Sequence, residues 1–325
     1  MFGLIPNTVY YAIRQYFQAQ HIVMPALYTN MLFVGVNLFL NVALVHGLGP
    51  FPGLGFIGSP IATSLSRTLQ LVVFILYTCT WKKLHRTTWP DGSFWDCFSK
   101  RHVSEYFKQT IPTMIGNAIE QWQFEAVTLM ASRLSVVDLA TQSAVFNIFY
   151  TFHCITFGLS KAITCRVGYY LGANQPRYAR FTSLLAIWLC LGISVCIAAI
   201  LYLIRNVIGH LYSLDPAIWA DSASLMTFLS ITYIGVSLLM ALISILFGQG
   251  RPFPVAVVGG LCAWVVSLPA AYTFSFVFSF GLVGLWMGLS CGYFLSAILL
   301  GAIVYRSDWN DCAIQAVSRS TIVYD

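Results

Sequence analysis

The sequence predicts an all-α, polytopic membrane protein, built as a bundle of about eight transmembrane helices with the remnant of another. Hydrophobic residues make up 58% of its 325 residues and charged residues only 9%, against roughly 25% charged in soluble domains. The apolar residues come in blocks of about 20 or more, the length that a helix needs to cross roughly 30 Å of hydrocarbon. We therefore expect an integral, multi-pass protein whose immediate surroundings are the lipid bilayer.

Eight apolar runs define the predicted helices. Residues 1–13 look like the tail of a further helix. The full runs, in chain order, are centred on residues 23–46, 59–81, 107–132, 139–160, 181–204, 222–247, 254–280 and 282–305. They are longer than most soluble core helices and lack the polar face that such helices show.

Basic residues lie in alternate connections between these runs. The basic connections and the C-terminal segment carry Arg14, Lys82, Lys83, Arg86, Lys100, Arg101, Lys108, Lys161, Arg166, Arg177, Arg180, Arg251, Arg306 and Arg319. The other connections carry only Arg133 and Arg205. By the positive-inside rule, the basic side and the C-terminus are cytoplasmic. Topology thus accounts for the formal charge of +6 without a nucleic-acid partner.

Two stretches of the chain resemble each other at an offset of 229 residues, from 20 to 249. Gln20-His-Ile-Val-Met-Pro25 and Gln249-Gly-Arg-Pro-Phe-Pro254 each open a helix, and Gly55-Phe-Ile-Gly58 and Gly281-Leu-Val-Gly284 each precede the next one. Transporters are often built from duplicated helical lobes, so we expect two related lobes, with about 120 residues of the first one absent. The alternative is a shorter arrangement of eight or nine helices in which these matches are accidental.

The strongest functional signal is a pair of carboxylates, Glu120 and Glu125, inside the run at 107–132; no other predicted helix interior contains one. A charge at the bilayer centre costs from about 2.5 kcal/mol upward, so it normally faces a cavity or a partner and marks an ion or substrate path. The two carboxylates differ by about 140° around the helix, so they cannot both point squarely into one pocket. We choose Glu120 first, because Gln123 lies in a similar direction and Pro112 can kink the helix beside it.

Burial favours the neutral form of a carboxyl, which brings proton binding and release within reach and lets a cation compete with the proton. A structural hydrogen bond between helices is the alternative role for both glutamates.

Polar and aromatic side chains near the glutamates or on other helices are the candidates for a substrate cavity. They are Gln121, Gln123, Asn37, Asn41, Gln142, Asn147, Tyr150 and Tyr293. Asn37 and Asn41 stand four residues apart, on one face of a helix. Aromatic rings such as those of Tyr150 and Tyr293 offer flat faces to an organic cation. Packing and hydrogen bonds between helices explain such residues equally well.

Several other classes of site are disfavoured. The sequence has no GxxxxGK[ST] loop, so we expect the energy for any transport to come from an ion gradient rather than from ATP. The nine cysteines include no CxxC pair, and the six histidines have no ligand constellation, so neither a metal nor another cofactor is expected. A membrane-embedded enzyme would need a catalytic constellation of buried polar residues, and we expect the protein not to be an enzyme.

The motifs resemble those of the multidrug and toxic compound extrusion (MATE) family. Arg14-Gln-Tyr-Phe-Gln-Ala-Gln20 and the following His-Ile-Val-Met-Pro25 resemble the family's loop before its fifth helix. Further matches are Gly58-Ser-Pro-Ile-Ala62, Val167-Gly-Tyr-Tyr-Leu-Gly-Ala-Asn174, Ala179-Arg180, Gly281-Leu-Val-Gly-Leu-Trp286 and Asp308-Trp309. By this resemblance, Glu120 and Glu125 occupy the place of an acidic pair whose first member is implicated in cation or proton coupling.

Three departures from the family's pattern bear on activity. Val236 sits where many relatives have an acidic residue, Phe247 replaces the usual Arg of an RGxG-like turn, and the first helices are absent. Arg251 can partly restore the positive charge at that turn. Without an acidic residue at Val236, the resemblance implies a mechanism with a single carboxylate, Glu120.

The family's architecture of two six-helix lobes (6+6) implies the domain boundaries. Residues 1–82 would be the remnant of the N-terminal lobe, and residues 83–106 a basic cytoplasmic loop between the lobes. Residues 107–306 would form the complete six-helix C-terminal lobe, followed by a cytoplasmic tail at 307–325. The missing N-terminal helices would then be required to complete the substrate cleft.

These features predict a secondary active antiporter that exports organic cations, drugs or amphipathic metabolites in exchange for protons or Na⁺. Rocking of the two lobes would supply alternating access. One alternative is a flippase for lipid-linked substrates, which would need cationic residues that the helix interiors offer only sparsely. Another is an inactive, truncated membrane protein.

Overall fold

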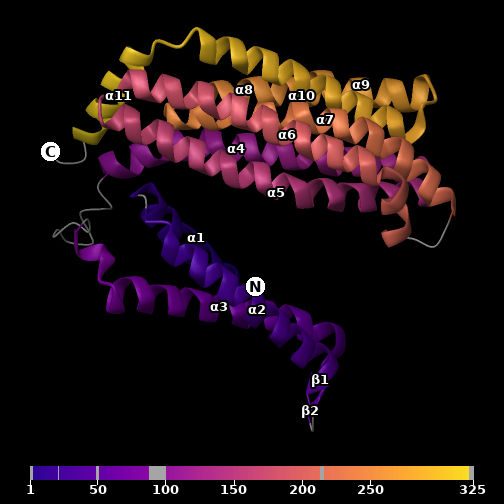
Figure 1. The fold of residues 1–325 in the computed structure, drawn as a ribbon, viewed down its shortest axis with the longest axis horizontal. Coiled ribbons are helices and arrows are strands. Elements are labelled where there is room, and N and C mark those ends of the chain that lie inside the picture. Colours follow the sequence, from indigo (N-terminus) through magenta and orange to yellow (C-terminus); the bar gives the residue numbers. More distant parts are fainter. Residues whose placement is uncertain (1–2, 21, 49–50, 88–99, 213–215, 322–325) are drawn as a thin grey trace. The chain divides into compact units, whose positions relative to one another are not determined.

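The computed structural model describes residues 3–20, 22–48, 51–87, 100–212 and 216–321, and almost all of them are helical (Figure 1). The chain forms two compact units, Met1–Asp96 and Cys97–Asp325. The boundary falls inside the predicted inter-lobe loop at 83–106, of which residues 88–99 lie outside the described part of the chain.

The first unit is built from two long helices and a shorter one. Its elements are α1 (Leu4–Ala19), α2 (Met24–His46), β1 (Gly47–Leu48), β2 (Phe51–Pro52), the short 3-10 helix η1 (Gly55–Ile57), α3 (Gly58–Ile75), its π-helical continuation η2 (Leu76–Trp81) and η3 (Leu84–Thr87). The two short strands pair antiparallel between α2 and α3. The aromatic rings of Tyr10, Phe17 and Phe74 form its buried core.

The second unit is a bundle of long helices that alternate in direction (Figure 1). Its elements are α4 (Lys100–Ala131), α5 (Val136–Gly172), α6 (Pro176–Tyr212), α7 (Pro216–Gly248), α8 (Pro252–Leu261), η5 (Cys262–Ser267), α9 (Leu268–Tyr272), η6 (Thr273–Val277), α10 (Gly281–Tyr305) and α11 (Trp309–Thr321). The segments α8, η5, α9 and η6 follow one another without a break and form one rod, residues 252–277, with two π-helical turns.

The helix starts follow local sequence rules. Proline occupies the first position of α6, α7 and α8 and lies within the first two positions of α2, where its missing N–H costs nothing because the first amides of a helix are unpaired anyway. Before α5, the hydroxyl of Ser135 accepts a hydrogen bond from the backbone amide of Asp138. This is the N-cap arrangement that Ser favours.

Each of the eight predicted runs coincides with one long helix or rod. Within the described part of the chain, six helices can span a membrane by length and composition: Met24–His46, Gly55–Trp81, Pro176–Asn206, Ala223–Gly248, Pro252–Val277 and Gly281–Tyr305. The other two runs lie in α4 and α5, which are more polar. Within the predicted tail at 307–325, the structure adds helix α11, whose short apolar face gives no membrane-length signal in the sequence.

The alternation of basic connections has a simple geometric counterpart in the second unit. The turns at 173–175, 249–251 and 306–308 lie at the end that carries α11, and those at 132–135 and 278–280 lie at the opposite end (Figure 1). Arg177, Arg180, Arg251 and Arg306 therefore share one end, and Arg133 lies at the other. Which side of the membrane this basic end faces stays a prediction.

The repeated motifs also match in conformation. Gly55 and Gly281 have φ angles of 58° and 56°, a left-handed conformation that favours glycine. Three residues later, Gly58 and Gly284 each approach the preceding helix so closely that a Cβ atom would overlap its backbone, near Leu44 and Phe274 respectively. The two units thus turn from one helix into the next in the same way, as a duplicated lobe requires.

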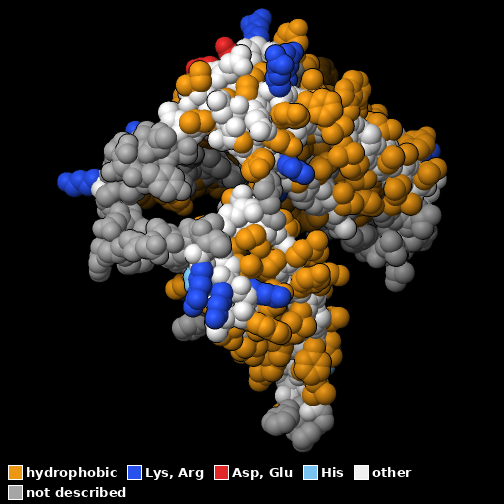
Figure 2. All heavy atoms as spheres, turned by 60° about the vertical axis from the view of Figure 1, so that its left-hand side comes forward, with side chains coloured by type: hydrophobic (Ala, Val, Ile, Leu, Met, Phe, Trp, Pro, Cys, Tyr) orange, Lys and Arg blue, Asp and Glu red, His pale blue; other side chains and the backbone are white. Residues whose placement is uncertain are grey.

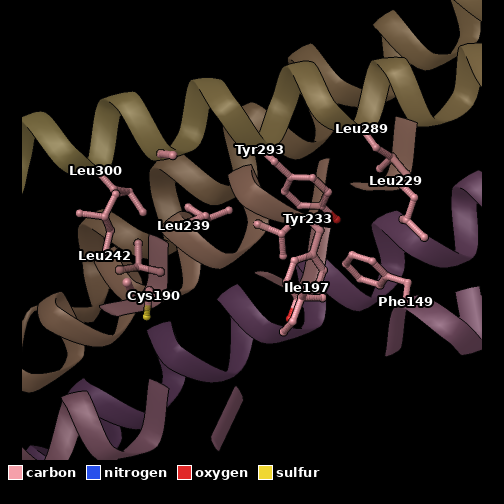
Figure 3. Packing of buried hydrophobic residues seen from close by; sticks show 14 of the residues in the cluster. Phe149, Cys190, Ile197, Leu229, Tyr233, Leu239, Leu242, Leu289, Tyr293 and Leu300 are labelled. Carbon is pink, nitrogen blue, oxygen red and sulfur yellow. The ribbon is translucent and has the colours of Figure 1, made fainter. Parts of the chain in front are cut away.

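Helix α10 packs backbone to backbone against the rod 252–277. A Cβ atom on Gly284, Gly288 or Gly292, which stand four residues apart on one face, would overlap Phe274, Ala271 or Ser267. Small residues at this spacing let membrane helices approach closely, where dispersion replaces the hydrophobic effect as the driving force. The wider core between α5, α6, α7 and α10 is filled by larger side chains such as Tyr233 and Leu242 (Figure 3).

Gly288→Ala should destabilise the second unit by roughly 1–3 kcal/mol, because the added methyl group must push the backbone of Ala271 away. The measurement is thermal unfolding of the purified protein in detergent. Gly192→Ala in α6 is the matched control, since a Cβ there meets nothing within 4 Å. Equal melting temperatures for the two variants would contradict the close packing.

Candidate functional site

The predicted coupling segment lies in the second half of α4, and its side chains point in different directions. Gln123 is buried, Glu120 is half-buried, and Glu125 and Gln121 are exposed. This matches the expectation that the two glutamates cannot face one pocket. Glu120 lies eleven residues before the end of α4 at Ala131, which is about 16 Å along a helix and hence well inside the bundle.

Gln123 ties α4 to the neighbouring rod and to α10. Its side-chain amide donates to the Ser267 hydroxyl at 2.7 Å, and that hydroxyl donates to the backbone carbonyl of Gly288 at 3.2 Å. All three groups are buried. Ser267 is the last residue of the π-helical turn η5, and π-bulges inside helices occur frequently at functional sites. Gln123 therefore fixes the rotation of α4 and with it the direction of Glu120.

Tyr293 of α10 is the neighbour that shares the surroundings of Glu120. It is 5% exposed and projects into the interior of the bundle (Figure 3), and its hydroxyl lies within electrostatic range of the Glu120 carboxyl. That hydroxyl has no hydrogen-bond partner among the described residues. Glu120 likewise has no ion pair or side-chain hydrogen bond within the part of the chain that the structure describes. Two adjacent polar groups thus keep binding capacity for a proton, a cation or water.

Aromatic rings form a continuous cluster beside this pair. Ring centroids are 6.4 Å apart for Phe124 and Tyr293, 5.1 Å for Phe124 and Phe146, and 6.4 Å for Phe124 and Phe149. On the other side of Phe149, the rings of His153, Tyr233 and Trp286 follow at 5.6 to 6.0 Å. The faces of such rings attract cations, so the carboxylate and the cluster together suit an organic cation.

Gln142 of α5 has a structural bond and a spare donor. Its carbonyl accepts a hydrogen bond from the indole of Trp286 at 2.7 Å, which links α5 to α10. Its side-chain NH₂ group is buried and has no partner among the described residues. Gln142 is therefore both a packing residue and a potential ligand, as the sequence left open.

The remaining predicted cavity residues of the second unit, Asn147 and Tyr150, are more exposed to the surface. Asn147 is exposed, and its amide donates to the Ser143 carbonyl one turn earlier on the same helix. Tyr150 is 56% exposed and stacks on Phe146 with centroids 6.3 Å apart. Both lie on α5 at the outer margin of the aromatic cluster.

Asn37 and Asn41 belong to helix α2 of the first unit, and Asn41 joins that helix to α3. The Asn41 amide donates to the carbonyl oxygen and to the side-chain oxygen of Asn37 at 2.9 and 3.2 Å. The hydroxyl of Ser59 in α3 donates to the Asn41 side chain at 2.8 Å. This is the interhelical hydrogen bonding that the sequence offered as the alternative to a cavity role.

Sequence reasoning missed a polar cluster in the first unit. The side-chain oxygen of Asn30 accepts hydrogen bonds from Tyr10 at 2.7 Å and from Gln70 at 2.8 Å. Arg67 donates to Gln70 at 3.4 Å and is half-buried near the middle of the span Gly55–Trp81. The sequence could have pointed to this cluster, because Arg67 is a lone cation inside a predicted helix interior, where charges mark functional positions.

The aromatic cluster was also only partly foreseen. Phe146, Phe149, Tyr150 and His153 occupy positions that recur at intervals of three and four residues on α5, which places them on one face of a helix. That spacing could have identified the face, although the contact of this face with Phe124 and Tyr293 comes from the packing of three helices.

The positions that depart from the family pattern are structurally ordinary. Val236 is buried in the apolar core, so no acidic group faces Glu120 from that position. Phe247 is half-buried against the same core. Arg251 donates a hydrogen bond to Ser307 at 3.1 Å and so holds the turn after α7 to the end of α10. Within the described residues, no three His, Cys, Asp or Glu side chains gather as metal ligands.

Tyr293→Phe should leave the thermal stability unchanged or raise it slightly, because the hydroxyl it removes is buried without a hydrogen bond. Tyr233→Phe is the matched comparison. The Tyr233 hydroxyl bonds the Phe152 carbonyl and Thr156, so its loss should cost about 1–3 kcal/mol. Thermal unfolding in detergent compares the two, and an equal loss in Tyr293→Phe would show that its hydroxyl is engaged.

Comparison with known proteins gives a consistent answer. The family model MatE matches residues 112–273, which include Glu120, Gln123, Gln142 and Ser267. The chain is 27% identical to multidrug and toxin extrusion protein 2 of Pongo abelii, across 98% of this chain and 56% of that protein. It is 29% identical to protein DETOXIFICATION 16 of Arabidopsis thaliana, across 97% of this chain and 65% of that protein. The chain thus spans between about half and two thirds of these relatives.

Solved structures agree. The eukaryotic MATE transporter AtDTX14 superposes with a TM-score of 0.87 at 28% identity, over 98% of this chain and 70% of that one. The Vibrio cholerae MATE transporter VcmN shares the fold at 13% identity, with a TM-score of 0.82 over 95% of this chain and 69% of that one. With a bundle of apolar helices, the family's motifs and these matches, the chain belongs to the MATE family of multi-pass membrane transporters.

Proposed function

We propose that this chain is the coupling part of a secondary active antiporter that exports organic cations or amphipathic compounds in exchange for protons, or alternatively Na⁺. One observation carries the proposal: the Glu120 carboxyl lies inside the bundle without an ion-pair partner among the described residues, beside the unpartnered hydroxyl of Tyr293. A carboxyl in such a position is costly unless a mobile ligand visits it.

Exchange follows because the proton and the organic cation compete for the negative charge of the Glu120 carboxylate. The ionised Glu120 carboxylate supplies the counter-charge for an organic cation held against rings such as Phe124. Protonation removes that charge and releases the cation, and a new cation displaces the proton in turn. Tyr293 can donate its hydroxyl hydrogen to the carboxylate and so stabilise the ionised state between the two events.

Gln123 has a positioning role in this scheme. Its amide is engaged with Ser267, so it is not free to bind the proton or the cargo. Through Ser267 and Gly288, it couples the direction of Glu120 to the contact between α10 and the rod 252–277. A shift of that contact would turn the carboxylate and change its access to the two sides.

The predicted topology gives the direction of transport, and the ion gradient supplies its energy. With the basic end and the C-terminus in the cytoplasm, as the positive-inside rule predicts, cargo enters from the basic end and leaves at the end that carries Arg133. About 2.3 kcal/mol accompanies each charge moved through 100 mV and about 1.4 kcal/mol each pH unit. Such a driving force supports cargo gradients of several-fold to about a hundred-fold.

The chain spans only part of its relatives' length, so we also propose that the helices preceding α1 in those relatives are needed to complete the cargo cleft. The test therefore uses two proteins in proteoliposomes. One is this chain alone, and the other is this chain preceded by the N-terminal helices of the DETOXIFICATION 16 relative.

Glu120→Gln should abolish transport of a fluorescent organic cation driven by an imposed pH gradient, because glutamine cannot change its charge. Glu125→Gln is the matched control on the same helix, and its exposed side chain predicts at least half of the native rate. Full pH-driven transport in Glu120→Gln would reject the mechanism. If neither protein transports the cation, the result would favour the alternative that the chain is an inactive, truncated membrane protein.

A second candidate, a flippase for lipid-linked substrates, gains support from Arg67, a half-buried cation in the middle of a membrane span. A cation at that depth suits a phosphate-bearing head group. Flipping of a fluorescent lipid phosphate by the same proteoliposomes, lost in Arg67→Gln and retained in Glu120→Gln, would favour this function over antiport.

A further inference from the structure

A groove runs down the outside of the second unit between α6, α7 and α10, and Glu120 is not among the residues that line it. Its volume is about 330 Å³, within the range of small-molecule sites. Leu242 lines it from α7, and Ala297 and Gly301 line it from α10. The groove exists because these two residues of α10, four apart, have almost no side chain on the face turned toward α6.

The groove changes from apolar to polar along its length. Its deeper part is lined by aliphatic side chains, and its mouth by Arg180, Tyr305 and Trp309. Ala297 and Tyr305 are eight residues apart on α10, which is about 12 Å along the helix. A guanidinium and two aromatic residues at one end of an apolar channel of this length match the interface and the hydrocarbon of one leaflet.

The mouth lies at the basic end of the bundle. Arg180 is exposed and has no side-chain hydrogen bond or ion pair within the described part of the chain. The same end carries Arg166, Arg177, Arg251 and Arg306 against the acidic residues Asp308 and Asp311. Asp308 is already engaged, since its carboxylate accepts hydrogen bonds from the backbone amides that begin α11. The field at the mouth therefore favours an anion. Figure 2 shows blue Lys and Arg side chains at this end, above a surface dominated by hydrophobic side chains.

Helix α11 closes the mouth of the groove from the side. Its buried residues Cys312 and Ala313 hold it in place, and it packs against α5 and α6, which leaves Trp309 at the groove. Tryptophan prefers the head-group level of a bilayer. The helix thus lies where an interfacial helix would lie, beside the polar end of the channel.

We propose that this groove binds one anionic phospholipid of the leaflet at the basic end, with its phosphate on Arg180 and an acyl chain along Ala297 and Gly301. Charge complementarity selects the head group, and the absence of side chains on α10 makes room for the chain. The exposed lining residues Leu184, Ile298 and Tyr305 open the groove sideways, so a lipid can enter from the bilayer. Because α6, α7, α10 and α11 all contribute, the bound lipid would brace the end of the bundle at which the lobe must move.

The test is native mass spectrometry of the purified full chain, titrated with a phosphatidylglycerol and with a phosphatidylcholine of identical acyl chains. Native protein should bind one phosphatidylglycerol more tightly than phosphatidylcholine. Arg180→Ala should weaken phosphatidylglycerol binding about fivefold, as expected for one basic side chain at a membrane surface, and phosphatidylcholine binding less, because the choline cation of that lipid already balances its phosphate. Arg133→Ala, which removes an exposed charge at the opposite end, should change neither.

Gly301→Leu should abolish binding of both lipids by filling the groove, since Gly301 lines it and a Cβ there meets only Leu242, in ordinary contact at 3.7 Å. Gly192→Leu on α6 is its matched control. Equal affinities for the two lipids in native protein, or Arg180→Ala binding like Arg133→Ala, would overturn the proposal. A dimer of this chain that Gly301→Leu dissociates would also overturn it, because the groove would then hold a second copy.

Discussion

The structure of the second unit depends on one contact, the approach of α10 to the rod formed by residues 252–277. Gly284, Gly288 and Gly292 bring the two backbones together with no side chain between them, and the rod accommodates this with two π-helical turns. Ser267 of the rod adds a hydrogen bond across this contact, since its hydroxyl donates to the Gly288 carbonyl of α10.

The candidate site inherits its geometry from that contact. Ser267 accepts the hydrogen bond of Gln123, and Gln123 sets the rotation of α4. Glu120, three residues before it, therefore faces Tyr293, whereas Glu125 is turned outward. The carboxylate is directed by packing and kept without a compensating cation among the described residues, an arrangement that costs stability and suits a group whose charge must change.

The two units use polar side chains in different ways. In the second unit, Tyr233, Ser160 and Thr164 join α5 to α7 through bonds to Thr156, Met240 and Ser244, each with satisfied partners. In the first unit, Asn30 and Gln70 bond each other beside the cation of Arg67. Such interhelical hydrogen bonds hold membrane helices that apolar packing alone would leave free to slide. Among the buried polar groups without a hydrogen-bond partner in the described residues, the Tyr293 hydroxyl is the neighbour of Glu120.

The sequence alone determined the class of protein and the positions of the eight long helices, and it predicted which acidic residue is the candidate for coupling. These follow from local quantities: the length of an apolar run, the alternation of basic connections and the cost of a carboxylate in hydrocarbon. The repeat at Gly55 and Gly281 was also visible, because a left-handed turn requires glycine in both copies. Helix α11 was not, since its apolar face is short.

Only the tertiary structure decided which candidate residues keep a buried polar group without a partner among the described residues and which bond neighbours or lie at the surface. In the sequence, Asn41, Asn147 and Tyr150 are candidates of the same kind as Tyr293 and Gln142. In the structure, Asn41 and Asn147 bond neighbouring residues, and Tyr150 lies at the surface. The aromatic wall of Phe124, Phe146 and Phe149, and the groove beside Gly301, exist only where three or four helices meet. The physical reason is that an α-helix fixes the direction of each side chain relative to its own axis, while the rotation and spacing of that axis are set by contacts between residues far apart in the chain.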